Sequence, residues 1–396
     1  MTSHTMHSIA AVVALVLGWL VVPVAAADGQ AAQVRADGQA AQVRASEQAA
    51  PAKAKGWVVP RTPDGKPDLQ GNWTNETQTP LERMGTQGGT LTDQQAAAIE
   101  QRAQVVEDFR DKPSDPNRPA PPKGGEPGRL AAPGQQSFIE IISEAAGGAV
   151  GGYNGFWLDP GLNVIRIDGV ARSSIIIDPP TGRLPPLTAA GKQRLTEIAA
   201  KTKKFGEFDH PEMRPLADRC LLSFGSNAGP PMLPNYFYNN NYTIVQTKDH
   251  VVILTEMNHD ARIIRLGVKD HQPAGLRPWF GDSIGRWEGD TLVVETTNIH
   301  PAQLDQTSIL WAYRGASENL KVTERFTRSG ADTLLYRFTM EDPATFTAPF
   351  TGELPFGRLE EMVCEYACHE GNHAMANILS GERVREREAA QKKPQQ

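Results

Sequence analysis

The chain has 396 residues, with 40 lysines and arginines against 46 aspartates and glutamates, and a formal net charge of −6 at neutral pH. A mildly acidic chain without basic clusters is poorly suited to nucleic acid or anionic lipid, so we expect no nucleic-acid partner. The 36 glycines and 30 prolines favour turns and short strands over long helices.

An apolar run near the amino terminus predicts export. The stretch "IAAVVALVLGWLVVPV" covers residues 9–24 and leads into three alanines, the small-residue pattern of a cleavable signal peptide, with cleavage expected after Ala27. Gly18 and Pro23 interrupt the run, which argues against a permanent membrane helix. We therefore predict a periplasmic or secreted protein without stable membrane insertion, in a compartment that permits disulfides.

The segment after the signal is not expected to fold. The nonapeptide "ADGQAAQVR" occurs twice in succession and contains almost nothing apolar to bury. We predict a signal peptide at residues 1–27, a disordered linker at 28–55, one β-rich domain at 56–384 and a charged disordered tail at 385–396.

The amino-terminal part of this domain combines one strand with a long insertion at residues 77–230. Gly71-x-Trp73 opens the strand. Within the insertion, Thr92 and Gln95 form a capping box that predicts a helix over 92–110, and a second helix is expected over 188–204. The insertion is thus predicted to contain loops, these two helices and three short β-type runs, "SFIEII", "NVIRID" and "SSIIID".

Residues 241–366 show the pattern of an antiparallel meander. Runs rich in β-branched residues alternate with Gly, Asp and Asn turns, which join neighbouring strands. With six or more strands, closure into a barrel removes exposed edges. The fold class we predict is mainly β with a few helices, organised as an antiparallel, barrel-like sheet. The runs are "NYTIVQT", "HVVILTEM", "ARIIRL", "IGRW", "TLVVETT", "LKVTERFTR" and "TLLYRFTM".

Three cysteines allow one disulfide and one free thiol. Covalent haem attachment requires two residues between its cysteines, whereas Cys364 and Cys368 are separated by three. On a strand these two side chains would lie about 13 Å apart, so direct pairing would need a sharp bend. Cys220 is the more plausible partner for Cys368, in a bridge that would close a long loop and leave Cys364 free.

The motif "HEGNH" raises the possibility of zinc. His369, Glu370 and His373 match the zinc-protease pattern, in which both histidines share one face of a continuous helix. Gly371 disfavours such a helix and Asn372 is better suited to cap a helix that begins after it. Zinc bound by His369 and His373 is a remote alternative, and we expect no cofactor.

Five motifs together resemble a family of exported bacterial proteins. They are "TPDGKPDLQGNW", "AGPPMLPNYFYNNNYTIVQT", "HDARIIRL", "GRWEGDTLVVETTN" and "EYACHEGN", and the resemblance covers residues 56–382. In that family the position of His373 is commonly tyrosine and Cys364 is not a regular feature. The resemblance thus argues further against a zinc site and supports the Cys220–Cys368 pairing. The Gly-x-Trp opening also resembles lipocalin-like barrels.

The candidate catalytic residues are His369, Glu370, His259, Asp260 and Arg262. A neutral imidazole beside a carboxylate is suited to general acid–base catalysis, and the bridge at the neighbouring cysteine would hold it rigidly. We predict His369 as the acid or base, Glu370 or Asp260 orienting it, and Arg262 or His259 polarising the substrate. In the simpler alternative, His259 and Asp260 are ordinary turn residues and Arg262 pairs with Asp260.

Five further residues are candidates for substrate binding: Tyr236, Asn240, Trp279, Trp287 and Glu324. The aromatic residues and Asn240 have the alternative of ordinary loop, rim or core positions. Glu324 alternates with apolar neighbours and should face the barrel interior. If the turn comprises residues 329–332, Arg337 lies directly opposite Glu324, and an internal ion pair is the alternative.

Two classes of function follow. The first is an exported enzyme, a hydrolase or lyase, that acts on a small organic or sugar-like substrate by general acid–base chemistry. The second is a non-catalytic, lipocalin-like protein that holds an amphipathic ligand between Trp279, Trp287 and the tyrosines. Polar residues near strand ends favour the enzyme. The sequence leaves the oligomeric state open.

Overall fold

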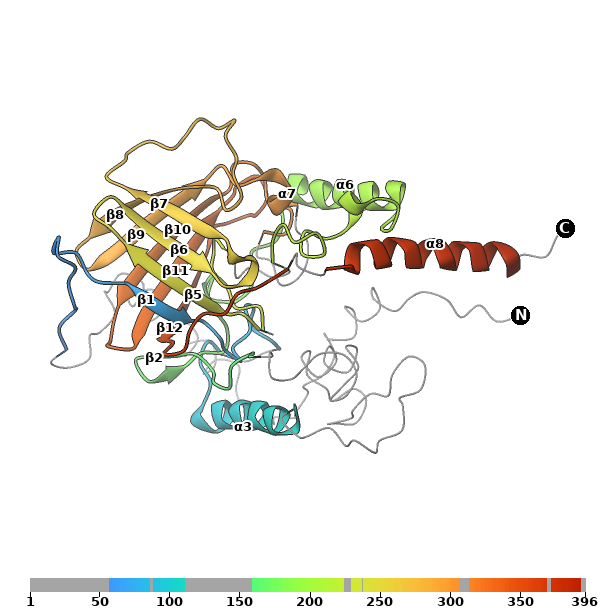
Figure 1. Ribbon diagram of the computed structural model, residues 1–396. Coiled ribbons are helices and arrows are strands. Elements are labelled where there is room, and N and C mark those ends of the chain that lie inside the picture. The colour runs from blue at the N-terminus through green and yellow to red at the C-terminus, as the bar shows by residue number, and fades with distance from the viewer. Residues whose placement is uncertain are drawn as a thin grey trace.

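The strands of the protein close into a barrel, as the computed structural model shows (Figure 1). The structure describes residues 57–85, 88–110, 159–223, 229–236, 238–305, 313–368 and 372–392. The expected signal peptide and linker lie outside these residues. Within the described ranges, nine strands form the closed sheet, in the order β1-β5-β6-β7-β8-β9-β10-β11-β12.

The barrel strands are β1 (Gly71–Thr74), β5 (Asn241–Gln246), β6 (His250–Thr255), β7 (Ala261–Leu266), β8 (Asp282–Glu288), β9 (Thr291–Thr297), β10 (Lys321–Arg328), β11 (Thr333–Glu341) and β12 (Phe350–Arg358). Closure occurs between the first and last of them, because Trp73 pairs with Tyr242 on one side and Arg358 on the other. A short strand, β4 (Ile176–Asp178), adds to β12 at Gly352. The predicted barrel-like, mainly-β fold is confirmed.

One pair of strands departs from the predicted antiparallel meander. β7 and β8 run parallel, with Ile264 opposite Ser283. The reason is the connection at 267–281, which is long enough to carry the chain back to the start of β7 before β8 begins. A two-residue hairpin turn would have forced the antiparallel direction.

Strand β12 was not predicted from the sequence. Its sequence "FTGELPFGR" contains two glycines and Pro355, residues that weaken strand patterns. The structure accommodates Pro355 because β4 pairs with β12 at Thr351–Gly352 and β1 pairs with it at Gly357–Arg358. Pro355 lies opposite Leu335 of β11, and it falls between the contacts of β12 with β4 and with β1, so that its missing N–H disrupts neither of those two contacts.

Both predicted helices are present. α3 (Asp93–Arg110) begins with the expected capping box, since Gln95 N donates to Thr92 Oγ1 at 3.2 Å and Thr92 N donates to Gln95 Oε1 at 2.9 Å. α6 (Ala189–Phe205) follows Thr188, whose hydroxyl accepts from Gly191 N. Shorter elements are β2 (Arg166–Ile167), β3 (Val170–Ala171), η2 (Pro211–Met213), η4 (Met257–His259) and α7 (Pro301–Leu304).

A third long helix, α8 (Ala374–Lys392), extends away from the barrel on the side where α6 lies (Figure 1). It differs from the predicted tail, because the helix continues to Lys392 instead of ending before residue 385. Alanines and the pairs Arg383–Glu386 and Glu382–Arg385 support this continuation. Most of its residues are exposed, with Arg383 lying 3.5 Å from Asp209 of the body.

Candidate functional site

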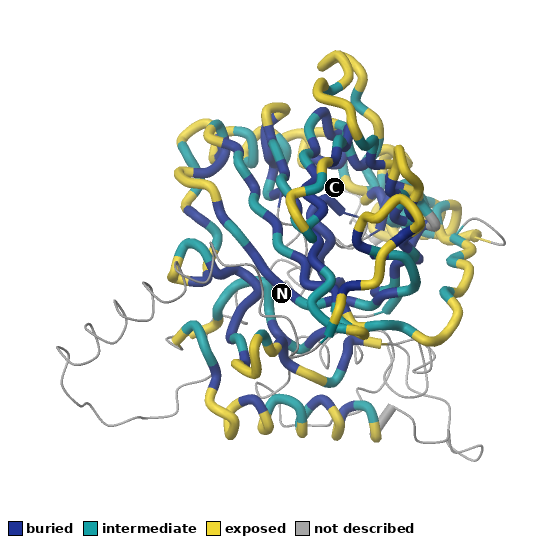
Figure 2. Tube along the Cα trace, turned by 90° about the vertical axis from the view of Figure 1, so that its left-hand side faces the viewer, coloured by how far each residue is buried: buried dark blue, intermediate teal, exposed yellow. Residues whose placement is uncertain are grey.

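The interior of the barrel is a packed core. Phe356 contacts Tyr242 and Tyr336, with ring centroids 5.4 Å and 5.2 Å apart, and Tyr336 in turn contacts Phe326 at 5.0 Å. Buried residues follow the strands inward, while exposed residues gather at loops (Figure 2). Because aromatic side chains contact one another across the lumen, a ligand there would have to displace them. The fully buried aromatic residues of the strands are Trp73, Tyr242, Phe326, Tyr336, Phe338, Phe350 and Phe356.

A buried ion pair lies within this core. Arg262 Nη2 donates to Glu324 Oε1 at 3.0 Å. Arg262 Nη1 lies 3.0 Å from Glu324 Oε2, an ion-pair contact that is not aligned as a hydrogen bond. The Tyr336 hydroxyl donates to Glu324 Oε1 at 2.8 Å and accepts from Met232 N at 2.9 Å. Burial and the negative charge of Glu324 raise the pKa of Tyr336. The network thus attaches the segment at Met232 to the barrel.

The predicted partner of Glu324 was wrong. Phe338 lies opposite Glu324, and Arg337 lies opposite Arg325, so the register is shifted by one residue. The cause is the turn, which is one residue longer than expected and begins the ladder with Arg328 opposite Leu334. A one-residue shift moves every side chain to the other face. Arg337 therefore pairs with Glu353 instead, its Nε donating to Glu353 Oε2 at 2.8 Å.

The predicted catalytic residues are only partly described. His369 and Glu370 lie outside the described residues, as does the side chain of His259. Asp260 follows η4, where its carbonyl accepts from Thr255 N at 2.9 Å. Arg262 is 4% exposed and is paired inside the barrel, a position that favours a structural role over polarising a substrate. The predicted catalytic roles of these residues stay predictions.

The predicted binding residues occupy separate places. Asn240 is fully buried, accepting from Asn235 N at 3.0 Å and donating to Asp159 O at 3.0 Å, while the Tyr236 hydroxyl donates to Thr79 O. Trp279 precedes β8 and stacks on His300 at 3.9 Å, whereas Trp287 is near the other end of β8. Burial lowers the pKa of His300. Since the two tryptophans flank opposite ends of a strand, a small ligand between them is not favoured.

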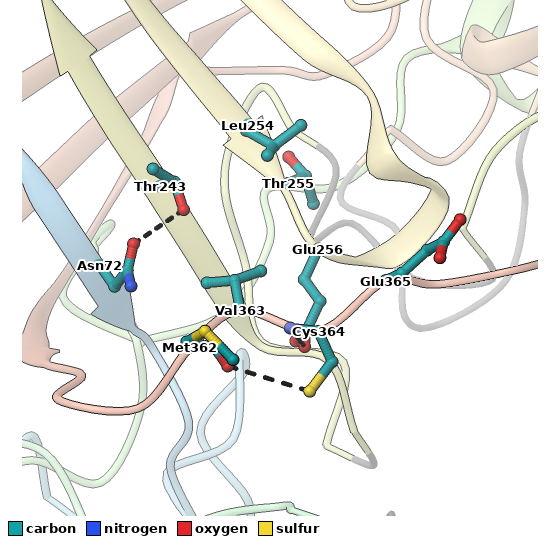
Figure 3. A pocket seen from close by; sticks show the side chains of 9 residues that line it. All are labelled: Asn72, Thr243, Leu254, Thr255, Glu256, Met362, Val363, Cys364 and Glu365. Atoms are coloured by element: carbon teal, nitrogen blue, oxygen red, sulfur yellow. Dashed lines mark hydrogen bonds between the residues drawn. The ribbon is translucent and has the colours of Figure 1, made fainter.

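A hollow on the outer wall is the strongest candidate for a functional site (Figure 3). We call residues 359–368, which cross the outside of β1, β5 and β6, the strap. The hollow has a volume of about 410 Å³ and opens between the strap and the barrel wall. This volume is within the usual range of small-molecule sites. Its lining residues are Asn72, Thr243, Leu254, Thr255, Glu256, Met362, Val363, Cys364 and Glu365.

Polar contacts hold the strap over the hollow. Asn72 Nδ2 donates to Glu361 O at 3.2 Å, and Thr243 Oγ1 donates to Asn72 Oδ1 at 2.8 Å. Glu256, which is 5% exposed, accepts from Cys364 N at 3.2 Å and from Asn241 Nδ2 at 2.9 Å. The Glu256 carboxylate is thus fixed at the wall of the hollow by two donors.

The carboxyl group of Glu76 interacts with the charge of Glu361 on the strap, and its pKa is strongly perturbed. Burial, a hydrogen bond with Asp159, and the charges of Asp159 and Glu361 raise its pKa from an ordinary 4.5 to about 8. Glu361 directly precedes Met362 of the hollow. Asn72 and Thr74 are the outward-facing residues of β1, and Glu76 continues the same alternation two residues after Thr74. A carboxyl group that keeps its proton at neutral pH therefore lies next to carboxylates.

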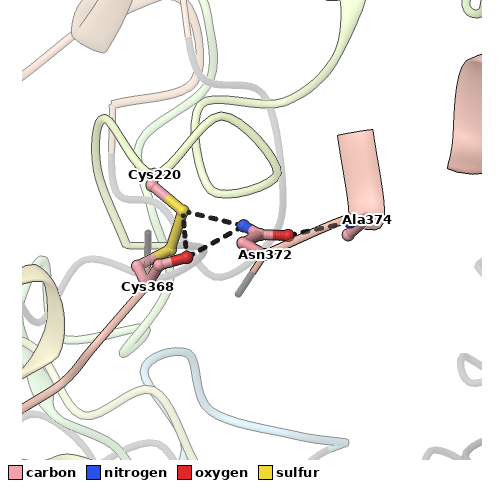
Figure 4. The surroundings of a disulfide bond; sticks show 4 residues. All are labelled: Cys220, Cys368, Asn372 and Ala374. Carbon is pink, nitrogen blue, oxygen red and sulfur yellow. Dashed lines mark hydrogen bonds between the residues drawn. A yellow bond between two sulfur atoms is a disulfide. The ribbon is translucent and has the colours of Figure 1, made fainter. Parts of the chain in front are cut away.

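A disulfide fixes the carboxy-terminal end of the strap (Figure 4). Cys220 and Cys368 are bonded, with their Cα atoms 5.7 Å apart, and Cys364 is a free, exposed cysteine. The pairing predicted from the sequence is confirmed. Asn372 Nδ2 donates to Cys368 O at 2.9 Å, and Asn372 Oδ1 accepts from Ala374 N at 2.9 Å, which confirms Asn372 as the cap of α8.

The zinc-protease motif does not lie within α8. The helix begins at Ala374, immediately after His373, whereas the motif needs a helix that carries both histidines. Over the ranges that the structure describes, no cluster of three His, Cys, Asp or Glu side chains is placed to hold a metal ion. The expectation of no cofactor stays a prediction.

Sequence reasoning missed Glu76, Glu256, Glu361 and Asp159. Polar residues alternate around Trp73, at positions 72, 74 and 76, and this period-two pattern places Glu76 on the outer face. No local pattern relates it to Asp159 and Glu361, which are brought there by the insertion and by the strap.

A comparison of the chain with protein-family models, curated proteins and solved structures finds no match. In the part of the chain that the structure describes, no helix is both long and apolar enough to span a membrane.

Proposed function

We propose that the protein is an exported enzyme, a hydrolase or lyase, that applies general acid–base chemistry to a small organic or sugar-like substrate in the outer hollow. The observation that carries the proposal is Glu76, whose pKa of about 8 keeps the carboxyl protonated at neutral pH. Catalytic acids commonly have a raised pKa of this kind, and neighbouring titratable groups with different environments commonly mark acid–base sites. Export, through cleavage after Ala27, is part of the proposal.

In the proposed chemistry Glu76 first donates a proton to the substrate and then accepts one. Glu76 donates its proton to the departing oxygen or nitrogen of the substrate, and the carboxylate that results accepts a proton from the attacking water or from the adjacent carbon. Asp159, hydrogen-bonded to Glu76, orients the carboxyl group. Fixed donors and acceptors from Asn72, Thr243 and Glu256 position a small polar substrate nearby.

His369 directly follows the strap in sequence and is therefore part of the same proposal. Residues 362–365 of the strap line the hollow, and Cys368, next to His369 in sequence, is fixed by the disulfide. We propose His369, with Glu370, as a second acid–base pair. This assignment is independent of Glu76, so the two are tested separately.

The test uses the mature protein and the variants Glu76→Gln, His369→Ala and, as a matched control, Glu318→Gln on a distant exposed loop. A panel of esters, glycosides and sugar acids is screened for turnover, and the carboxyl signal of Glu76 is titrated by carbon-13 NMR. We expect Glu76 to titrate near pH 8 and turnover to fall at least a hundredfold in Glu76→Gln but not in the control. Titration of Glu76 near pH 4.5, or full turnover by Glu76→Gln, would contradict the proposal.

A further inference from the structure

An apolar row crosses the outer face of three neighbouring strands. Val245 of β5 lies opposite Val252 of β6, which lies opposite Ile263 of β7. Val245 is 47% exposed and Ile263 is 57% exposed. We call these three residues the apolar row. Because the lumen of the barrel is already filled by aromatic side chains, the row lies on the solvent side of the sheet.

The apolar row is continuous with the outer hollow. The next row of cross-strand partners on the same face is Thr243, Leu254 and Ala261, and both Thr243 and Leu254 line the hollow (Figure 3). Met362 of the strap, also in the lining, is 86% exposed. The hollow and the row therefore form one surface that is apolar at one end.

The other end of this surface is negatively charged. Among the described residues that line the hollow are Glu256 and Glu365, with no basic side chain, and Glu361 adjoins them on the strap. Beyond the far end of the apolar row, His250 lies opposite Arg265, and Lys248 precedes it in the turn. Arg265 is paired with Asp282 and Lys248 with Asp249, so the hollow, and not the far end of the row, is the part of this surface that attracts a cation.

From this arrangement we infer that the surface binds an amphipathic amine, with its ammonium group at Glu365 and Glu361 and its apolar tail along Leu254 and the apolar row. The inference rests on the proposed function in that it uses the same hollow, and it specifies the class of substrate or ligand. The positive charge of an ammonium group complements the negative charge of the carboxylates, and an alkyl tail covers apolar side chains that are otherwise exposed to water.

The size of the surface favours a small ligand over a second copy of the chain. Three strands about 4.8 Å apart and six residues long present roughly 300 Å². A standard protein interface needs about 800 Å² from each partner. The exposed face is therefore too small for a stable dimer and sufficient for one alkyl chain.

The experiment measures binding of decylammonium by isothermal titration calorimetry, below its micelle concentration, with decanoate and butylammonium as comparison ligands. We expect decylammonium to bind, decanoate to bind at least tenfold more weakly because its charge is repelled, and butylammonium to bind more weakly because its tail is short. Equal binding of decylammonium and decanoate would overturn the inference.

Variants locate the site. Glu365→Gln should weaken decylammonium binding about fivefold, and Ile263→Ser should weaken it by a similar factor. The matched controls are Glu318→Gln and Val170→Ser, an exposed glutamate and an exposed valine elsewhere, which should leave affinity unchanged. Unchanged affinity in both site variants would show that the amine binds elsewhere and refute the inference.

The readout also separates this inference from the proposed function. Binding that depends on Glu365 and Ile263, together with a Glu76 that titrates near pH 4.5, would support the ligand class and reject the acid–base proposal. Turnover of a neutral substrate that depends on Glu76, without any binding of decylammonium, would reject the ligand class alone.

Discussion

Each face of strand β7 carries one residue that departs from the usual distribution of charged and apolar side chains. Arg262 points into the barrel, where it pairs with Glu324, while Ile263 points outward and is 57% exposed. In most antiparallel sheets the apolar face covers the core and the polar face meets water. Here the lumen holds a charged pair within aromatic side chains, and the outer wall presents an apolar row beside a carboxylate-lined hollow. The comparison supports the proposal that the chemistry of this protein takes place outside its barrel.

The largest expected effect comes from breaking the inner pair. Arg262→Met leaves Glu324 as an uncompensated buried carboxylate, and we expect a loss of about 3–5 kcal/mol in the free energy of unfolding, measured with urea. Arg325→Met is the matched control on β10, because its exposed pair with Glu288 should contribute about 0–1 kcal/mol.

A second variant of this site tests the cause. The double variant Arg262→Met, Glu324→Leu removes both charges and should recover most of the lost stability. If Arg262→Met alone lowered stability by less than about 1 kcal/mol, the lumen would be more hydrated than the packed arrangement implies.

On the outer side, the largest effect should come from the strap. Replacing Cys220 and Cys368 with serine should lower the free energy of unfolding by about 2–4 kcal/mol, because the bridge restricts a long loop in the unfolded chain. Cys364→Ser, which removes the exposed free thiol, should change stability by less than about 0.5 kcal/mol. Non-reducing peptide mapping that found a Cys364–Cys368 crosslink would contradict the arrangement.

Packing within the lumen gives a smaller effect. A methyl group added at Gly352 would lie 2.4 Å from the ring of Phe338, whereas at Gly357 its first neighbour, Thr74 Cγ2, would be 3.8 Å away. We expect Gly352→Ala to destabilise the protein by about 1–3 kcal/mol and Gly357→Ala to be much milder. Equal effects in thermal unfolding would indicate that the lumen has room that the structure does not show.

The last prediction concerns the dependence of stability on pH. The pKa of Glu76 is raised to about 8 in the folded protein and is near 4.5 when unfolded, so the unfolded chain loses this proton first. Its contribution to stability is complete below pH 4.5 and is lost as pH rises towards 8, by at most about 1.4 kcal/mol per pH unit before solvent screening. Glu76→Gln should flatten the dependence of stability on pH in this window. A wild-type protein whose stability did not fall there would contradict the raised pKa.

Much of the fold could be predicted because its determinants are local. The capping box at Thr92, the cap at Asn372 and the β-branched run of β7 are short patterns that the structure confirms. The partner of Glu324 could not be predicted, because one additional residue in a turn moves Arg337 to the opposite face. β12 was missed since Pro355 is tolerated only between β4 and β1, which pair with that strand from distant parts of the chain.

The candidate site was harder to predict for the same reason. Glu76, Asp159 and Glu361 come from the segment after β1, from the middle of the insertion and from the strap, and their proximity depends on closure of the barrel. The sequence also did not indicate which side chains of each strand face the barrel interior. The run "ARIIRL" alternates regularly, yet nothing in it indicates that the arginine at 262 faces inward.

The pairing of β1 with β12 also determines when the protein can finish folding. Thr74 meets Gly357, so the barrel stays open until nearly all of its strands have been synthesised. Such distant pairings make closure slow, and the unpaired edges of β1 and of the last strand already made remain available to other chains in the meantime. A nascent chain that ends before Arg358 thus has two strand edges with unpaired backbone groups. Quality control during synthesis would have to keep those edges apart until the last strand arrives.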